Sequence, residues 1–125
     1  LGSSVHANDE VNFAQSSNDV IPSAIQVGAA LLLEEGLRPS LKRLRSSIEQ
    51  RASGLQAVVK TGRTHLMDAM PITLAQEFGC WAAQLASCDE RLRDVEKRLT
   101  RLPLGGTAVG TGINATLYPQ DCSVV

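Results

Sequence analysis

The most regular hydrophobic pattern of the sequence lies between residues 74 and 99. Apolar side chains recur there at alternating intervals of four and three, the heptad spacing of a long packed helix: Leu74, Phe78, Trp81, Leu85, Cys88, Leu92, Val95 and Leu99. Thr73 and Gln76 have the spacing of a capping box at its start, and Pro103 follows its end. The pattern predicts a helix of roughly 28 residues, about 40 Å long, which needs partner helices of similar length.

Two stretches in the first half of the sequence also repeat apolar residues at helical spacing. The later one joins Leu41, Leu44, Ile48, Ala52, Leu55 and Val58 or Val59. The earlier one begins after a polar run and is expected to bury Ile21, Ile25, Ala29 and Leu32. Gly36 and Pro39 are expected to bend or interrupt the chain between them. The sequence thus predicts an all-α fold, a long-helix bundle with motif-bearing loops, and the long seam favours an oligomeric bundle.

Composition supports this fold class, because aromatic residues make up only 3% of the 125 residues, whereas sandwiches and barrels favour aromatic and β-branched residues. The chain is 43% hydrophobic and 20% charged, which is typical of a soluble globular domain. The net charge is −1 and basic residues are interleaved with acids, so we expect no nucleic-acid partner. No apolar run approaches the length of a membrane span and no signal peptide opens the sequence, so we expect no membrane partner.

The three cysteines, at positions 80, 88 and 122, are too few and too scattered for a disulfide framework or a zinc site. We therefore expect a reducing, intracellular setting and no bound metal. Residues 103–114 are rich in glycine, but no strand precedes them and no Gly-Lys-Ser/Thr follows, which excludes a phosphate-binding loop. A close-packed turn is the expected structure of this segment.

Ser16, Ser17, Asn18 and Asp19 form a polar run where the first predicted helix begins. A helix N-terminus offers unpaired N–H groups and a partial positive charge, which suit a carboxylate or a phosphate. The hydroxyls and the amide add neutral hydrogen-bond donors. Ordinary N-capping is the alternative, although four such residues in a row exceed what one cap needs. Spacing alone leaves both interpretations open.

A second polar cluster occupies residues 60–65, between two predicted helices, and ends in Thr64 and His65. A histidine on a loop with cationic neighbours could exchange a proton with an anionic substrate. Alternatively, His65 caps the preceding helix and Asp68 pairs with Arg63. The residues alone favour this structural alternative slightly.

The third polar cluster, His6-Ala7-Asn8-Asp9, contains the other histidine of the chain. A histidine with an acid three residues later lacks the third ligand of a metal site. Both histidines therefore belong to polar clusters, which is a weak indication of function.

Together these clusters resemble motifs of the fumarase and aspartase superfamily, and those of class II fumarases most closely. The similar strings follow the order and approximate spacing of the family: Val5-His6-Ala7-Asn8-Asp9-Glu10-Val11-Asn12, Gln15-Ser16-Ser17-Asn18-Asp19, Gly62-Arg63-Thr64-His65, Gln76-Glu77-Phe78 and Gly105-Gly106-Thr107-Ala108-Val109-Gly110-Thr111-Gly112-Ile113-Asn114. Strings in register form a far more specific signal than any one of them alone.

The resemblance implies reversible hydration of fumarate to malate, a reaction of the tricarboxylic acid cycle, without a metal or organic cofactor. It implies that His65 is the catalytic residue, which takes part in proton transfer. Aspartases tend to have glutamine at the position of His65, so hydration is favoured over ammonia elimination. The residues implied to bind the substrate carboxylates are Ser16, Ser17, Asn18 and Thr64. Those that resemble the family's second dicarboxylate site, near the active-site entrance, are His6, Asn8 and Asp9.

The resemblance also implies that residues 1–115 are part of the central helical-bundle domain, which packs four chains into a homotetramer. A cytoplasmic location is expected, with a mitochondrial one left open. The sequence departs from the family at Ala7, where proline is usual, and at Ala75, where glycine is common. Residues 116–125 are expected to be a non-family tail, and the family loop Gly-Ser-Ser-x-Met-Pro-x-Lys-x-Asn is absent.

We therefore expect a fragment of a fumarate hydratase, inactive by itself. Two alternatives remain open at this point. One is a sister lyase that eliminates ammonia or another leaving group from a succinyl-type substrate. The other is a non-catalytic helical oligomerisation fragment that keeps vestigial motifs.

Overall fold

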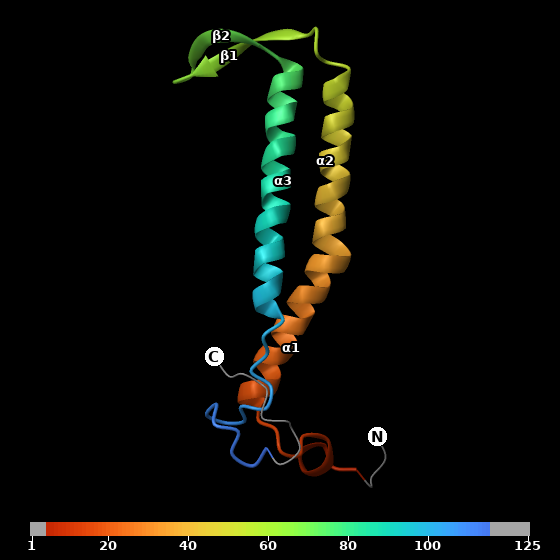
Figure 1. Ribbon diagram of the computed structural model, residues 1–125, viewed down its shortest axis with the longest axis vertical. Helices are drawn as coiled ribbons and strands as arrows, with labels where there is room; N and C mark the ends of the chain where they lie inside the picture. Colours follow the sequence, from red (N-terminus) through yellow and green to blue (C-terminus); the bar gives the residue numbers. More distant parts are fainter. Residues whose placement is uncertain (1–4, 116–125) are drawn as a thin grey trace. The chain divides into compact units, whose positions relative to one another are not determined.

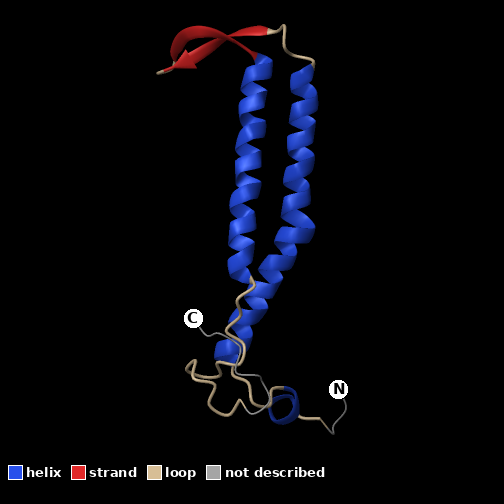
Figure 2. Cartoon of the chain, in the orientation of Figure 1, coloured by secondary structure: helices blue, strands red, loops and turns tan. Residues whose placement is uncertain are grey.

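The computed structural model describes residues 5–115, which form two compact units. One unit contains residues 5–31 and 96–115, and the other contains residues 32–95. The elements, in chain order, are η1 (Ala7–Val11), α1 (Ser17–Leu32), η2 (Leu33–Leu37), α2 (Arg38–Ser53), β1 (Val59–Thr64), β2 (Met67–Thr73) and α3 (Leu74–Leu99) (Figures 1 and 2). The expected tail, residues 116–125, lies outside the described residues.

Helix α3 confirms the prediction made from the heptad pattern, with 26 residues between Leu74 and Leu99. Its capping box is present, because Gln76 N–H donates to Thr73 Oγ1 (3.1 Å) and Thr73 N–H donates to Gln76 Oε1 (2.9 Å). Most of the seam is half-buried, and the Phe78 and Trp81 rings stack with centroids 5.0 Å apart. The predicted packing face therefore exists on this helix.

Gly36 and Pro39 were expected to bend or interrupt the chain. The interruption is wrong, because the chain stays helical from Ser17 to Ser53. The one-turn π-helix η2 lies between α1 and α2, and Arg38 N–H closes it by donating to the Leu33 carbonyl. Pro39 then falls in the first turn of α2, where a missing N–H costs little. A widened turn thus takes the place of an interruption.

The expected core of α1 is also wrong, because Ile21, Ile25 and Leu32 are 57%, 67% and 74% exposed. The buried residues of this helix are instead Asp19 and Ser23. The helix from Ser17 to Ser53 has an 18-residue window with a mean hydropathy of 1.4, of which 6% is buried. By length and composition this helix could cross a membrane. The expectation that no apolar run has the length of a membrane span is therefore wrong. Core helices of soluble bundles pass the same test.

The all-α prediction misses a two-stranded antiparallel sheet, since residues 60–65 are not a loop between helices. Strands β1 and β2 pair from Val59 with Thr73 to Thr64 with Met67, and the register shifts between Thr61 and Arg63. Gly62 lies at this shift, where an added Cβ would stand 2.7 Å from the Met70 carbonyl oxygen. Only glycine fits such a close approach of two strands. The fold is otherwise helical (Figure 2).

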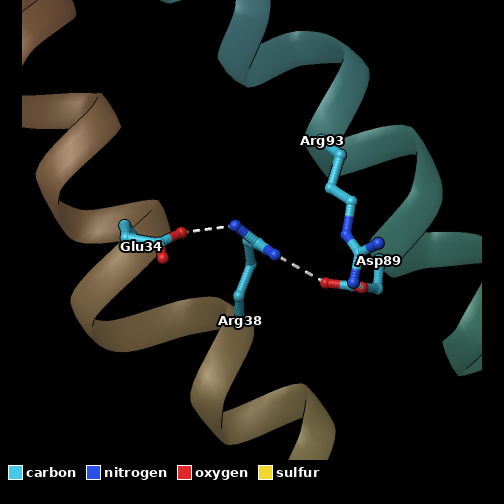
Figure 3. Close-up of polar contacts among 4 residues, drawn as sticks. All are labelled: Glu34, Arg38, Asp89 and Arg93. Atoms are coloured by element: carbon cyan, nitrogen blue, oxygen red, sulfur yellow. Dashed lines mark hydrogen bonds and ion pairs between the residues drawn. The ribbon is translucent and has the colours of Figure 1, made fainter.

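Within the second unit, α2 and α3 lie side by side and antiparallel, joined through the hairpin (Figure 1). Arg38 links them, because its Nε atom donates to Asp89 Oδ1 (3.1 Å) while its Nη1 atom pairs with Glu34 (Figure 3). Arg93 Nη2 contacts the other oxygen of Asp89 at 2.8 Å. These charged side chains and the aliphatic Leu41 and Leu85 line a cavity of about 420 Å³ between the helices.

Candidate active site

The polar run at the start of α1 caps this helix. Asn18 N–H donates to Ser16 Oγ (3.2 Å), and Ser16 N–H donates to Asp19 Oδ1 (3.0 Å). Ser16 is therefore the N-cap and Asp19 completes a capping box from the third helical position. The capping interpretation is thus right for Ser16 and Asp19. The side chains of Ser17 and Asn18 are exposed.

Asp19 also binds the glycine-rich segment. Its second oxygen, Oδ2, accepts hydrogen bonds from Gly105 N–H (3.1 Å) and Thr107 N–H (2.9 Å). The side-chain amide of Asn18 donates to the Ala108 carbonyl at 3.0 Å. The start of α1 and residues 105–108 therefore form one cluster, although they are more than 80 positions apart in the sequence.

The carboxylate of Asp19 is held in its charged form. Burial acts to raise its pKa, since only 2% of the residue is exposed. The hydrogen bonds from the Ser16, Thr107 and Gly105 N–H groups outweigh burial and leave the pKa below its ordinary value. The sequence indicated a capping residue at this position but not its contacts with the glycine-rich segment. The available signal was an acid three residues after a serine cap.

The glycine-rich segment is a close-packed turn, as expected. An added Cβ at Gly106 would lie 3.1 Å from the Pro103 carbonyl oxygen and 3.2 Å from Gly110 Cα. Gly105 and Gly110 have φ angles of +93° and +83°, which favour glycine. Close packing of this kind keeps the segment itself compact.

The start of α1 has the chemistry of an anion site. The helix dipole places a partial positive charge there, and hydroxyl and amide groups from Ser16, Ser17 and Asn18 surround it. The one negative charge of the motif, on Asp19, is buried and satisfied by three N–H donors. An incoming carboxylate would therefore meet neutral donors at the exposed surface.

Thr64 and His65 lie at the tip of the hairpin in the second unit. Thr64 ends β1 and pairs with Met67, which leaves His65 and Leu66 as the two turn residues. Their φ angles are +51° and +62°, the pair of positive values that a type I′ turn requires. Both side chains are exposed, and Leu66 is 100% exposed. The turn thus leaves the imidazole exposed to solvent.

One half of the structural alternative for this cluster is confirmed and the other half is wrong. Arg63 Nε and Asp68 Oδ1 pair at 3.2 Å, as that alternative proposed. His65 caps no helix, because it lies in the turn of a hairpin.

The base of the hairpin is anchored to α3. Lys60 Nζ donates to both carboxylate oxygens of Glu77, each at 2.9 Å. Leu74 N–H donates to the Val58 carbonyl, also at 2.9 Å. These contacts fix the direction in which the hairpin leaves the helix and so where Thr64 and His65 lie relative to α3.

The third cluster surrounds the π-helical turn η1. His6 N–H donates to Glu10 Oε2 at 2.6 Å, and Asn8 and Asp9 belong to the turn itself. His6, Asn8 and Asp9 are in the same unit as Ser16, Ser17 and Asn18, whereas Thr64 and His65 are in the other. Within residues 5–115, no group of three or more His, Cys, Asp or Glu side chains is arranged to hold a metal ion.

Comparison with known proteins adds the family context of these clusters. A family model described as "Lyase" matches residues 1–122. The chain is 64% identical over 110 residues to the class II fumarate hydratase of Xylella fastidiosa, covering 88% of this chain and 23% of that protein. It is 52% identical over 116 residues to that of Thermus aquaticus, covering 92% and 25%. The chain thus spans about a quarter of the length of the curated relatives it matches.

Solved structures of related lyases also match this chain. The class II fumarase of Schistosoma mansoni matches with a TM-score of 0.84 and 37% identity, over 89% of this chain and 23% of that one. A fumarate lyase:delta crystallin of Brucella melitensis, in a cobalt-bound structure, matches with a TM-score of 0.83 and 44% identity, over 90% and 24%. The elements of both units therefore have counterparts in known lyases.

Proposed function

The chain belongs to the fumarase and aspartase superfamily of lyases, and from this membership we propose that the whole protein reversibly hydrates fumarate to malate. The observation that carries the proposal is the 64% identity to a class II fumarate hydratase over 110 of the 125 residues. A match of that length includes both polar clusters, residues 16–19 and 60–65. His65 distinguishes this chain from aspartases, which tend to have glutamine there.

In the proposed mechanism, neutral donors bind the two carboxylates of the substrate. These donors are Ser16, Ser17, Asn18 and Thr64. When malate loses a proton from the carbon next to one carboxylate, the resulting carbanion-like intermediate places extra negative charge on that carboxylate. Hydroxyl and side-chain amide donors aimed at it, together with the positive end of the helix dipole, stabilise this charge, as an oxyanion hole does. The exposed, neutral start of α1 supports this assignment.

His65 is proposed to take part in proton transfer. An imidazole can give and take a proton, which is the chemistry that a general acid or base needs. The exposed position at the tip of an anchored hairpin supports this role, because the imidazole can reach a substrate beyond its own strands. No cofactor takes part in the proposed reaction. His6, Asn8 and Asp9 are proposed as a second dicarboxylate site.

The whole protein is proposed to act as a homotetramer in the cytoplasm, or in mitochondria, within the tricarboxylic acid cycle. Exposed apolar side chains on the helices, such as Ile25, Leu32 and Trp81, support assembly with further helices. The proposed substrate is a small dicarboxylate, and neither a nucleic acid nor a membrane is a proposed partner. Residues 1–115 would form part of the central helical domain.

Two other functions remain as alternatives to be tested. A sister lyase would eliminate ammonia or another group from a succinyl-type substrate. A non-catalytic fragment would only assemble helices, and the extent of exposed apolar surface is the observation that favours it.

The experiment is a chimera of the Xylella fastidiosa hydratase in which the 110 matched residues are replaced by those of this chain. We expect it to assemble with the mass of four chains and to lower the ultraviolet absorbance of fumarate as malate forms. The unaltered hydratase is the control for assembly and turnover. The isolated 125-residue chain should show negligible turnover, because it does not contain the segments of the site that the relative contributes in the chimera.

A tetrameric chimera that leaves fumarate unchanged would overturn the proposed hydration. Ammonia release from aspartate, with malate inert, would select the sister lyase. Tetramers without activity on either substrate would select the non-catalytic fragment.

A further inference from the structure

Asp19 is a buried acidic residue that the proposed reaction does not use. Its exposed fraction is 2%, so the side chain is almost completely buried. A buried carboxylate is strongly destabilising unless hydrogen bonds satisfy it. Both of its oxygens are satisfied by backbone N–H groups, one on Ser16 and two on the glycine-rich segment. The placement of this charge therefore has a structural cost that the cluster around it offsets.

The contacts of Asp19 and its neighbour form a connected pair. Asp19 accepts a hydrogen bond from Thr107 N–H. Asn18, which precedes Asp19, donates to the carbonyl of Ala108, which follows Thr107. The position of the Ala108 carbonyl depends on the backbone that Asp19 holds at Thr107. The orientation of the Asn18 amide therefore depends on the Asp19 carboxylate.

The conformation of Thr107 is one that the hydrogen bond from its N–H group to Asp19 helps to maintain. Its φ angle is +58°, a left-handed conformation that is strained for a β-branched residue. Its hydroxyl oxygen is buried and has no hydrogen-bond partner among the described residues. The side chain thus contributes no hydrogen bond that would fix the segment. The N–H groups of Thr107 and Gly105, both bound to Asp19, supply that restraint.

We propose that Asp19 is a positioning residue that tethers residues 105–108 to the start of α1 and thereby orients the side-chain amide of Asn18. The proposal deepens the proposed function, on which it rests, because Asn18 is one of the residues assigned to the substrate carboxylates. Asp19 touches no substrate in this assignment. Its lowered pKa keeps the carboxylate charged at neutral pH, so that both oxygens remain hydrogen-bond acceptors.

Asp19→Asn keeps the size of the side chain and removes one of its two acceptors, so it should weaken the tether only in part. An amide NH2 group cannot accept a hydrogen bond from a backbone N–H group. The new NH2 group therefore faces either Ser16 N–H or the N–H groups of Gly105 and Thr107, depending on how the amide is turned, and the hydrogen bonds on that side are lost. The amide should turn its oxygen toward Gly105 and Thr107, because this orientation keeps two hydrogen bonds and loses one. Asp19→Ala removes both acceptors.

The first readout is hydrogen exchange in the full 125-residue chain, followed by NMR at backbone amides and at the Asn18 side chain. In Asp19→Ala, exchange at Gly105, Thr107 and the Asn18 side-chain amide should be about tenfold faster or more. Asp19→Asn should show a smaller increase. Exchange within α3 should keep its wild-type rate in both variants, and Asp68→Asn on the hairpin is the matched control. Unchanged exchange at these three groups overturns the proposal.

Asp19→Glu covers the case in which both variants fail to fold. It keeps the charge and both oxygens but lengthens the side chain by one methylene, so it should loosen Gly105 and Thr107 while the helix stays capped. Wild-type exchange in this variant overturns the proposal as well.

The second readout is the KM for fumarate in the chimera, measured for Asp19→Ala, Asn18→Ala and the double variant. If Asp19 acts through Asn18, the double variant should resemble Asn18→Ala alone. Additive effects, as from a merely structural role, overturn the proposal. A chimera that is inactive with the native residues contradicts the proposed function only, and the exchange measurement then decides about Asp19 alone.

Discussion

At the scale of single residues, the hairpin tip combines an unusual backbone with the proposed catalytic group. His65 and Leu66 both have left-handed φ angles, which most residues other than glycine, asparagine and aspartate avoid. Conformations of this kind cost about 1–3 kcal/mol each and persist where surrounding structure imposes them. Strand pairing between Thr64 and Met67, and the anchor from Lys60 to Glu77, impose this one.

Leu66→Gly should therefore stabilise the chain by about 0.5–1 kcal/mol, since glycine relieves the strain and suits the second turn position. The side chain is 100% exposed, so its removal costs no buried contact. The measurement is the free energy of unfolding in urea. Met67→Gly is the matched control, and it should destabilise because glycine weakens a strand. A lower stability for Leu66→Gly than for the wild type would show that no strain is stored at the turn.

At the scale of elements, a charged pair of side chains joins α2 to α3. Asp89 accepts from Arg38 and contacts Arg93, and its side chain is 29% exposed (Figure 3). The hydrogen bond from Arg38 holds the pKa of Asp89 below the ordinary value of 3.8. A carboxylate with a lowered pKa stabilises the fold above its unfolded-state pKa, and this contribution is lost as the pH falls through the folded-state value.

Asp89→Asn should consequently lower the melting temperature at about pH 6. The gap to the wild type should narrow as the pH falls below 3.8 and through the lower folded-state pKa of Asp89. Protonation of Asp89 in the wild type removes the same interaction that the variant lacks. Thermal melts followed by circular dichroism measure both gaps. Asp68→Asn is the control, because its pair with Arg63 is 75% and 71% exposed and should contribute little at any pH. A gap that stays constant in acid would exclude a charged Asp89 as its cause.

The same scale shows why some elements could be predicted and others could not. Helix α3 was predictable because a heptad seam and a capping box specify both its face and its start. The hairpin was missed because Val58 and Val59 continue the helical spacing of α2, and because its turn is His65-Leu66. The sequence signals of such turns are Asn-Gly and Asp-Gly. Register and anchoring, rather than turn propensity, select the conformation here.

Among the candidate site residues, the polar runs were predictable from their donors and spacing, but the contacts of Asp19 with the glycine-rich segment were not. Its partners, Gly105 and Thr107, are more than 80 residues away, and only the folded backbone brings their N–H groups to it. Local sequence shows the capping half of its contacts alone.

At the scale of the whole molecule, the described residues bury very little apolar surface, and Ala82 is the one hydrophobic residue among them that is buried. The expected core of α1 is exposed for the same reason, because a heptad face buries its side chains only against further helices. The proposed substrate-binding and proton-transfer residues belong to two compact units. A complete bundle is therefore the setting in which the proposed site has to be tested.

The most direct test is the initial rate of fumarate hydration by the chimera with His65→Asn and with Leu66→Asn. Asparagine tolerates left-handed φ angles, so both variants keep the turn while only the first removes the imidazole. Loss of a proton-transfer group should slow hydration by about 100-fold or more in His65→Asn. Leu66→Asn should stay within about threefold of the unmodified chimera, because it replaces an exposed side chain. Equal rates in the two variants would contradict proton transfer by His65.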